Sequence, residues 1–208
     1  MHETATAAAA DPHEGEPYRR IRAAHTATTV TVYQAYRPEL GLPAARDGRF
    51  PAAWKRERMT WIKPSFLWMM YRCGWATKAD QETVLAVEIT REGFDHALAH
   101  ACLSHHVPSR HGDFAAWQTA LRRSPARVQW DPERDLHLDP LPYRSLQLGL
   151  SGSASRAYAD AWTVSIRDVT PLAREIHALV RAGQDEAARA LLPRETPYPA
   201  GPLPHLGA

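Results

Sequence analysis

The chain has 208 residues, a formal net charge of +2, 44% hydrophobic residues and seven tryptophans. This length fits one domain, and the apolar content suffices for a core without disulfide bonds. Cys73 and Cys102 form no CxxC pair, which argues against a redox motif or a zinc ribbon. The chain shows neither a secretory leader pattern nor an apolar run of membrane-spanning length, so we expect a cytoplasmic protein that does not enter a membrane.

The two terminal segments differ in composition from the rest of the chain. Residues 1–17 are rich in Ala, Thr, Pro and acidic residues, and residues 193–208 hold five of the 17 prolines. Such compositions are typical of tails. We therefore expect a disordered N-terminal tail, a single globular domain over residues 18–192 and a proline-rich C-terminal tail.

The first predicted element is a strand over residues 28–36, TTVTVYQAY, because β-branched and aromatic residues dominate it. Its period of two places four side chains on one face: Val30, Val32, Gln34 and Tyr36. A helix should follow from Pro38, which suits a first turn, to Asp47, where Gly48 supplies a C-terminal cap.

The order of strand followed by helix recurs twice. Residues 58–62 predict a short strand, and residues 64–71 predict a helix that Gly74 ends. The sequence TVLAVEIT at residues 83–90 predicts a strand, and an amphipathic helix should follow over residues 92–103.

The second half predicts further helices over residues 114–122, 170–182 and 184–192, and strands over residues 127–131, 143–150 and 162–168. The irregular spacing favours an α+β domain, with a mixed, twisted β-sheet flanked by helices, over a doubly wound fold. Neither GxGxxG nor GxxxxGK[ST] is present, which excludes the best-marked nucleotide sites.

Residues 54–72, WKRERMTWIKPSFLWMMYR, form a basic and aromatic segment. The five cations of this segment are Lys55, Arg56, Arg58, Lys63 and Arg72. Glu57 opposes them, so the segment carries +4 and the rest of the chain −2. Cations attract phosphates, and flat rings stack on bases or on nicotinamide. We expect this segment to form the functional surface. The alternative is that its first cations are solvent-exposed side chains of a loop.

The predicted helix within this segment divides into two sets of side chains. Ser65, Trp68 and Tyr71 or Arg72 share one face and could line a cleft. The other set has the pattern of core residues: Phe66, Leu67, Met69 and Met70. Lys63 precedes the helix N-terminus, where free N–H groups favour an anion, so we expect a phosphate or carboxylate ligand there.

A histidine-rich stretch follows at residues 96–111. His96 and His100 have a workable i, i+4 spacing for a metal, but the glutamate of HExxH is missing. Solvated or core histidines are the preferred interpretation, and we predict no metal site.

Candidate acids and amides lie on two predicted strands. Tyr143, Ser145 and Gln147 form the polar face of PYRSLQLGLSG, which faces solvent or floors a cleft. Glu88 lies opposite the apolar face of its own strand. The acidic run at residues 131–135 is more typical of a turn than of catalytic carboxylates.

Five stretches together resemble a widespread microbial family known only as a domain of unknown function. They are VYQAY (32–36), RMTWIKPSFLWMMYR (58–72), ITREGF (89–94), VQWDPERDL (128–136) and PYRSLQLGLSG (142–152). The resemblance covers about residues 18–199, and it implies no mechanism.

A more distant resemblance is to the ADP-ribosyltransferase superfold. It implies that Gln34 or Tyr36 contacts the ribose of NAD, that Ser65 and Tyr71 flank the nicotinamide, and that the third motif falls on YRSLQLGL. Gln147 stands where that superfold has a catalytic glutamate. An amide can orient a hydroxyl but cannot supply the carboxylate that stabilises an oxocarbenium-like centre.

We therefore expect an enzyme, of ADP-ribosyltransferase-like fold, that acts on NAD, a phosphorylated nucleotide or an RNA end. The candidate catalytic residues are Ser65, Glu88 and Gln147, with Glu88 or Asp131 as possible substitutes for the missing glutamate. The candidate cofactor-binding residues are Gln34, Tyr36, Arg58, Lys63, Trp68, Tyr71, Arg72 and Arg144. The alternatives are a non-catalytic RNA- or DNA-binding module, and a protein-interaction domain that uses an exposed Trp54 and the proline-rich end.

Overall fold

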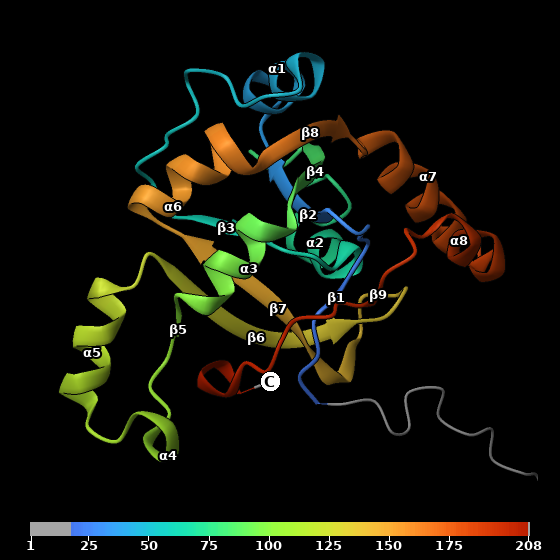
Figure 1. The fold of residues 1–208 in the computed structure, drawn as a ribbon. Coiled ribbons are helices and arrows are strands. Elements are labelled where there is room, and N and C mark those ends of the chain that lie inside the picture. The colour runs from blue at the N-terminus through green and yellow to red at the C-terminus, as the bar shows by residue number, and fades with distance from the viewer. Residues whose placement is uncertain (1–17, 208) are drawn as a thin grey trace, which may run out of the picture.

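The computed structural model describes residues 18–207, so the predicted N-terminal tail lies outside the described residues. Two sheets form its centre (Figure 1). The first is antiparallel and has the order β2-β4-β8, with β2 at Thr29–Tyr36, β4 at Thr83–Thr90 and β8 at Thr163–Asp168. The second has the order β3-β7-β6-β5, with β3 at Thr60–Ile62, β7 at Pro140–Leu150, β6 at Ala126–Arg134 and β5 at Ala101–Leu103. Its β5–β6 pair is parallel. The α+β class with mixed pairing is confirmed.

The two sheets meet where β2 passes β3. Tyr33 N donates to Lys63 O at 2.7 Å, and Lys63 N donates to Tyr33 O at 3.3 Å. This bridge begins one residue beyond the end of β3 and therefore holds Lys63 beside the C-terminal half of β2. The pocket described below is built at this junction.

The helices near the junction begin and end at residues whose chemistry explains their bounds. Helix α1 spans Pro38–Asp47 and ends at Gly48, whose φ of 65° is accessible to glycine at no steric cost. Helix α2 spans Phe66–Cys73. The Ser65 side chain caps α2 by accepting from Trp68 N, and Gly74 ends it with a φ of 59°.

The remaining elements cover the sheets and their edges. They are α3 (Arg91–Ala99), α4 (Pro108–His111), α5 (Phe114–Arg123), α6 (Gly152–Ala157), a π-helix (Tyr158–Trp162), α7 (Thr170–Arg181), α8 (Asp185–Leu191) and a 3-10 helix (Pro204–Leu206). A short two-stranded sheet pairs β1 (Arg22–Ala23) with β9 (Thr196–Pro197). In Figure 1, α7 and α8 lie together on one side of the molecule, and α4 and α5 project on the other.

The helix predicted over residues 92–103 is instead a helix and a strand. Helix α3 ends at Ala99, and β5 begins at Ala101 and pairs with β6. The side chain of Leu103 is fully buried in the core by this pairing. Tertiary pairing overrides the helical periodicity of the last few residues, as happens where both patterns fit a short apolar run.

Two hydrophobic clusters lie on opposite faces of β2. Val30 and Val32 point into the larger cluster, between the sheets, whereas Tyr33 points into the cluster beneath α2 and α7. The four residues of α2 that the sequence predicts for the core follow that prediction. Phe66, Met69 and Met70 are buried in the second cluster, and Leu67 packs against it.

The C-terminal segment that composition predicts to be a tail packs against the domain. Strand β9 pairs with β1, and the side chains of Tyr198, Leu203 and Leu206 are buried. Trp130 Nε1 donates to Leu206 O at 2.9 Å. Proline restricts φ to values that suit an extended chain, so a proline-rich strap can pack without forming a long strand. The packed body therefore continues past residue 192.

Candidate functional site

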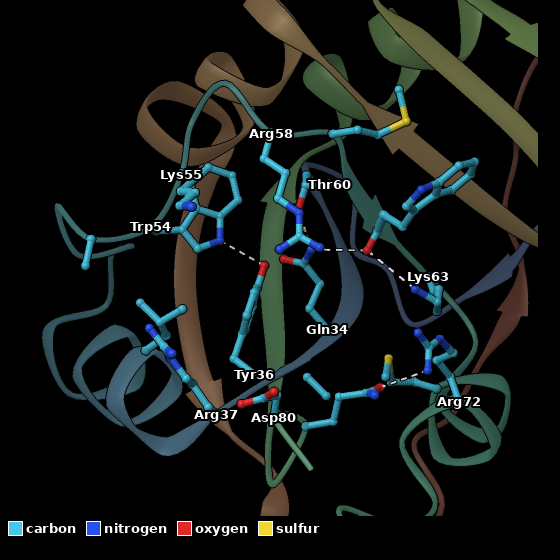
Figure 2. A pocket seen from close by; sticks show the side chains of 17 residues that line it. Gln34, Tyr36, Arg37, Trp54, Lys55, Arg58, Thr60, Lys63, Arg72 and Asp80 are labelled. Atoms are coloured by element: carbon cyan, nitrogen blue, oxygen red, sulfur yellow. Dashed lines mark hydrogen bonds between the residues drawn. The ribbon is translucent and has the colours of Figure 1, made fainter. Parts of the chain in front are cut away.

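A cavity of about 550 Å³ opens at the junction of the two sheets (Figure 2). Its walls come from the C-terminal end of β2, the start of α1, residues 53–61, α2 and residues 80–81. The charged residues that line it are Arg37, Lys55, Arg58, Lys63, Arg72 and Asp80. Among the described residues, five basic side chains therefore line a concave site with one acid, an arrangement that focuses positive potential.

The floor of the pocket is fixed by hydrogen bonds. Gln34 Nε2 donates to Thr60 Oγ1 at 3.0 Å and to Trp61 O at 3.1 Å, and Gln34 Oε1 accepts from Tyr158 OH at 2.7 Å. Tyr36 OH accepts from Trp54 Nε1 at 2.9 Å. Burial raises the pKa of Tyr36, so its hydroxyl stays neutral at physiological pH. These polar groups are held in place before any ligand arrives.

Arg58 and Lys55 are the exposed cations of the upper wall. Figure 2 shows Arg58 pointing into the centre of the pocket. Among residues 18–207, neither side chain has a hydrogen bond or an ion pair with the protein. Their neighbour Arg56 differs, because Asp160 binds it at 2.7 Å. The two unpaired cations are thus free to hold an anion from solution.

Lys63 and Arg72 occupy the inner wall. Lys63 is 6% exposed, and its Nζ lies 3.5 Å from Trp61 O and 5.2 Å from the centroid of the Trp68 ring. Burial lowers the pKa of Lys63 to about 7, and the charge of Arg72 acts in the same direction. Arg72 Nη1 donates to Gln81 Oε1 at 3.3 Å.

The N-terminus of α2 is occupied by two carboxyl groups of the protein itself. Phe66 N donates to Glu195 Oε1 at 2.7 Å, and Ser65 Oγ donates to Glu133 Oε1 at 2.8 Å. Burial raises the pKa of both glutamates. The acceptors at this helix end therefore come from the protein itself, and the Phe66 N–H is not free for the phosphate or carboxylate ligand that the sequence predicts there.

The model of a family described as a domain of unknown function, DUF4291, matches residues 20–198. The chain belongs to the DUF4291 family. The matched span contains every residue of the pocket and also Glu133 and Glu195. No curated protein matches the chain significantly. Within residues 18–207, none of the helices combines the length and the apolar character that crossing a membrane requires.

The DUF4291 fold brings together only part of the expected site. Five of the expected cofactor-binding residues line the pocket: Gln34, Tyr36, Arg58, Lys63 and Arg72. Six of the expected catalytic or binding residues do not line it: Ser65, Trp68, Tyr71, Glu88, Arg144 and Gln147. The residues that converge come from β2, from the positions that flank β3 and from α2, and the bridge between Tyr33 and Lys63 joins β2 to the end of β3.

The expected residues of α2 that miss the pocket have structural partners. Ser65 is buried between Trp68 N and Glu133. Trp68 is buried beneath Lys63. Tyr71 is 41% exposed, and the guanidinium of Arg134 lies 3.6 Å from the centroid of its ring. Ser65 and Tyr71 therefore do not flank the pocket in the way that the ADP-ribosyltransferase resemblance implies.

The remaining candidates lie on other faces of the sheets. Glu88 Oε2 accepts from Ser165 Oγ at 2.6 Å, and Arg144 Nε donates to Tyr18 OH at 2.8 Å. Gln147 Nε2 donates to Asp131. Each is thus held by a neighbour outside the pocket.

Several residues of the pocket were not among the expected site residues. Arg37 follows β2 directly, and Asp80 adopts a φ of 64° in the loop after α2. No periodic pattern marks such loop positions. Trp54 also lines the pocket, but it is only 5% exposed, so it is not the exposed contact that a protein-interaction domain would use.

The paired histidines of α3 lie away from the pocket. The rings of His96 and His100 are 4.2 Å apart, and His100 Nδ1 lies 2.8 Å from His96 O. Within the described part of the chain, no group of three or more His, Cys, Asp or Glu residues could hold a metal ion.

Proposed function

We propose that the pocket binds a phosphorylated small molecule of nucleotide size. The convergence of five basic side chains and one carboxylate, among the described residues, on a single cavity carries this proposal. Its volume of about 550 Å³ falls in the range of small-molecule sites. Arg58 is the principal anchor, because its guanidinium is unpaired among the described residues and presents a planar fork that matches two phosphate oxygens.

The aromatic walls support a ligand that also carries a flat ring. Tyr36, Trp54 and Trp61 line the cavity. Trp61 packs against Gly149, where an added Cβ would lie 3.1 Å from the indole ring. Gly149 therefore lets this indole lie flat on β7. Stacking of a base or a nicotinamide on such rings stabilises binding by about 1–3 kcal/mol, which makes NAD and nucleoside diphosphates the first ligands to test.

A more specific proposal is that the protein transfers ADP-ribose, a reaction that requires a particular chemical group in the pocket. The positions of Gln34 and Tyr36 on β2 support it, because both residues line the cavity where the resemblance implies a ribose. The reaction needs a carboxylate near the developing positive charge. Among the described lining residues Asp80 is the sole carboxylate, so it takes the place that Gln147 cannot fill.

Isothermal titration calorimetry with pyrophosphate, ADP and NAD tests the proposal. Arg58→Ala should weaken the binding of each ligand by about 10–100-fold, the usual loss for a charge-assisted hydrogen bond. The matched control is Arg123→Ala, which removes an exposed arginine on α5 and should leave affinity unchanged. Failure of all three ligands to bind the wild-type protein would refute the proposal.

The same titrations separate this function from general RNA or DNA binding. A nucleic-acid surface should bind single-stranded RNA with an affinity that falls steeply as salt rises, roughly one decade per decade of salt for each phosphate neutralised. Binding to the pocket should be inhibited by pyrophosphate. RNA binding that pyrophosphate leaves unchanged would assign the cations to an extended nucleic-acid surface instead.

A further inference from the structure

Lys63 differs from the other lysine of the pocket in its surroundings. Lys55 is exposed, whereas Lys63 is 6% exposed and reaches the cavity from its inner wall. Its Nζ contacts Trp61 O at 3.5 Å, which is at the outer limit of a hydrogen bond. An ammonium group has three donors, and within residues 18–207 Lys63 has no ion pair with a carboxylate.

This environment favours the neutral amine. Burial is the main cause that lowers the pKa of Lys63 to about 7, and Arg72 adds to it. Asp131 on β6 and Cys73 on α2 act in the opposite direction. A free lysine, with a pKa of about 10.4, is almost fully protonated at neutral pH and cannot act as a nucleophile. Lys63 has a large neutral fraction under the same conditions.

The pocket separates the amine from cations that can hold a phosphate. Figure 2 shows Lys63 and Arg72 on one side, Lys55 and Arg37 on the opposite side, and Arg58 between them. A ligand whose phosphate lies against Arg58 and Lys55 presents its other end to Lys63. That arrangement leaves the amine free to meet an uncharged group of the same ligand.

We propose that Lys63 is a nucleophile that forms an imine with the aldehyde or ketone of a phosphorylated sugar bound in the pocket. This inference rests on the proposed function and adds a reactive group to the class of ligand. A reducing sugar phosphate has both parts that the pocket accommodates, an anion for the cations and a carbonyl for the amine.

The step needs no oxidant, reductant or metal. The lone pair of Nζ forms a bond to the carbonyl carbon, the π electrons of the carbonyl move to oxygen, and that oxygen takes up a proton from nitrogen. The resulting carbinolamine takes up a proton from solvent on its hydroxyl and expels water as the nitrogen lone pair forms the C=N bond. The product is a protonated imine.

The surroundings of Lys63 also suit this cationic product. The face of Trp68 lies 5.2 Å from Nζ and attracts a cation, and the negative charge of Asp131 acts in the same direction. The amine can therefore be neutral before the reaction and the nitrogen positively charged after it.

Reductive trapping tests the inference. The protein is incubated with ribose 5-phosphate, whose open-chain form is an aldehyde, and with sodium cyanoborohydride, which reduces an imine to a stable secondary amine. Peptide mass spectrometry then locates the adduct. Lys63 should carry at least about tenfold more adduct than Lys55, because its neutral fraction at pH 7 is far larger than that of an ordinary amine.

The pH dependence of the wild-type protein provides a second measurement that needs no variant. The rate of adduct formation at Lys63 should reach half its maximum near pH 7. The rate for N-acetyl-lysine should still be rising at about pH 10. A rate at Lys63 that follows the model compound would overturn the inference.

Competition and substitution link the adduct to the pocket. Excess pyrophosphate should suppress labelling of Lys63, and ribose without its phosphate should label it weakly. Lys63→Met, which keeps most of the side-chain volume, should lose the adduct.

The outcomes distinguish this inference from the proposed function. A wild-type protein that binds pyrophosphate but carries no adduct on Lys63, or carries as much on Lys55, overturns the imine and leaves anion binding intact. A wild-type protein that does not bind pyrophosphate overturns the proposed function and this inference with it.

Discussion

The pocket and the N-terminus of α2 are neighbouring groups of hydrogen-bond donors, but they differ in their acceptors, because the helix end has its acceptors within the protein. At the helix end, Glu195 accepts from Phe66 N and Glu133 accepts from Ser65 Oγ. In the pocket, Arg58 and Lys55 have no protein partner among the described residues. The comparison teaches that hydrogen-bond donors at a helix end do not by themselves define a binding site, because the chain itself can supply the acceptors.

Because of this difference, we expect the helix end to stabilise the fold and the pocket to bind a ligand. The internal carboxylates join three distant parts of the chain, since Glu133 lies on β6 and Glu195 lies in the C-terminal strap beside β9. Their contacts should stabilise the fold. The unpaired cations contribute little to the fold and remain available for a ligand.

Removing the free cations should produce the largest effect. The double variant Lys55→Ala/Arg58→Ala should lose about 100-fold or more in pyrophosphate affinity, because two charged contacts are removed together. Its thermal unfolding midpoint should stay at the wild-type value, since both side chains are exposed. Calorimetry and a thermal melt measure the two quantities. A strongly lowered midpoint would show that these cations hold the fold.

Removing an internal carboxyl group should have the opposite effect: it should lower the stability of the fold and leave the ligand affinity nearly unchanged. Glu195→Ala leaves the Phe66 N–H without its acceptor and loosens the C-terminal strap, at a cost of about 1–3 kcal/mol in the free energy of unfolding. Chemical denaturation measures this loss. Pyrophosphate affinity should remain within about twofold of wild type, because Glu195 does not line the pocket.

Glu195→Gln provides the matched control for that variant. Its amide oxygen can still accept from Phe66 N, so it should lose less stability than Glu195→Ala. Equal losses from the two substitutions would indicate that the charge, and not the accepted hydrogen bond, matters at this helix end.

The two sites should also give the free energy of unfolding opposite dependences on pH. Because the folded protein raises the pKa of Glu133 and Glu195, it binds more protons than the unfolded chain, and stability should fall as pH rises above about 4.3. Because it lowers the pKa of Lys63 to about 7, stability should rise with pH from there to about 10.4.

Urea denaturation across pH separates these contributions. Glu133→Gln/Glu195→Gln should flatten the fall in stability at the acidic end, and Lys63→Met should flatten the rise at the alkaline end. A variant that changes the slope at the wrong end would contradict the assignment of that slope to its site.

Local sequence signals predict several elements closely. Strand β4 spans the predicted residues 83–90, and α1 spans Pro38–Asp47 with Gly48 at its cap. Both depend on interactions between residues close in the chain, namely alternating apolar side chains and the conformational freedom of glycine. Strand β5 and the packed segment after residue 192 escaped prediction because each is stabilised by partners distant in the sequence.

The sequence by itself determined the α+β class, the membership of a family whose stretches recur over most of the chain, and the concentration of cations between residues 54 and 72. Only the tertiary structure decided which of those cations stay unpaired. Glu195 lies 129 residues after Phe66, yet it fills the helix end. Asp160 neutralises Arg56, whereas Arg58 has no such partner within residues 18–207. Charge pairing depends on distance in space, which the local pattern of a chain does not contain.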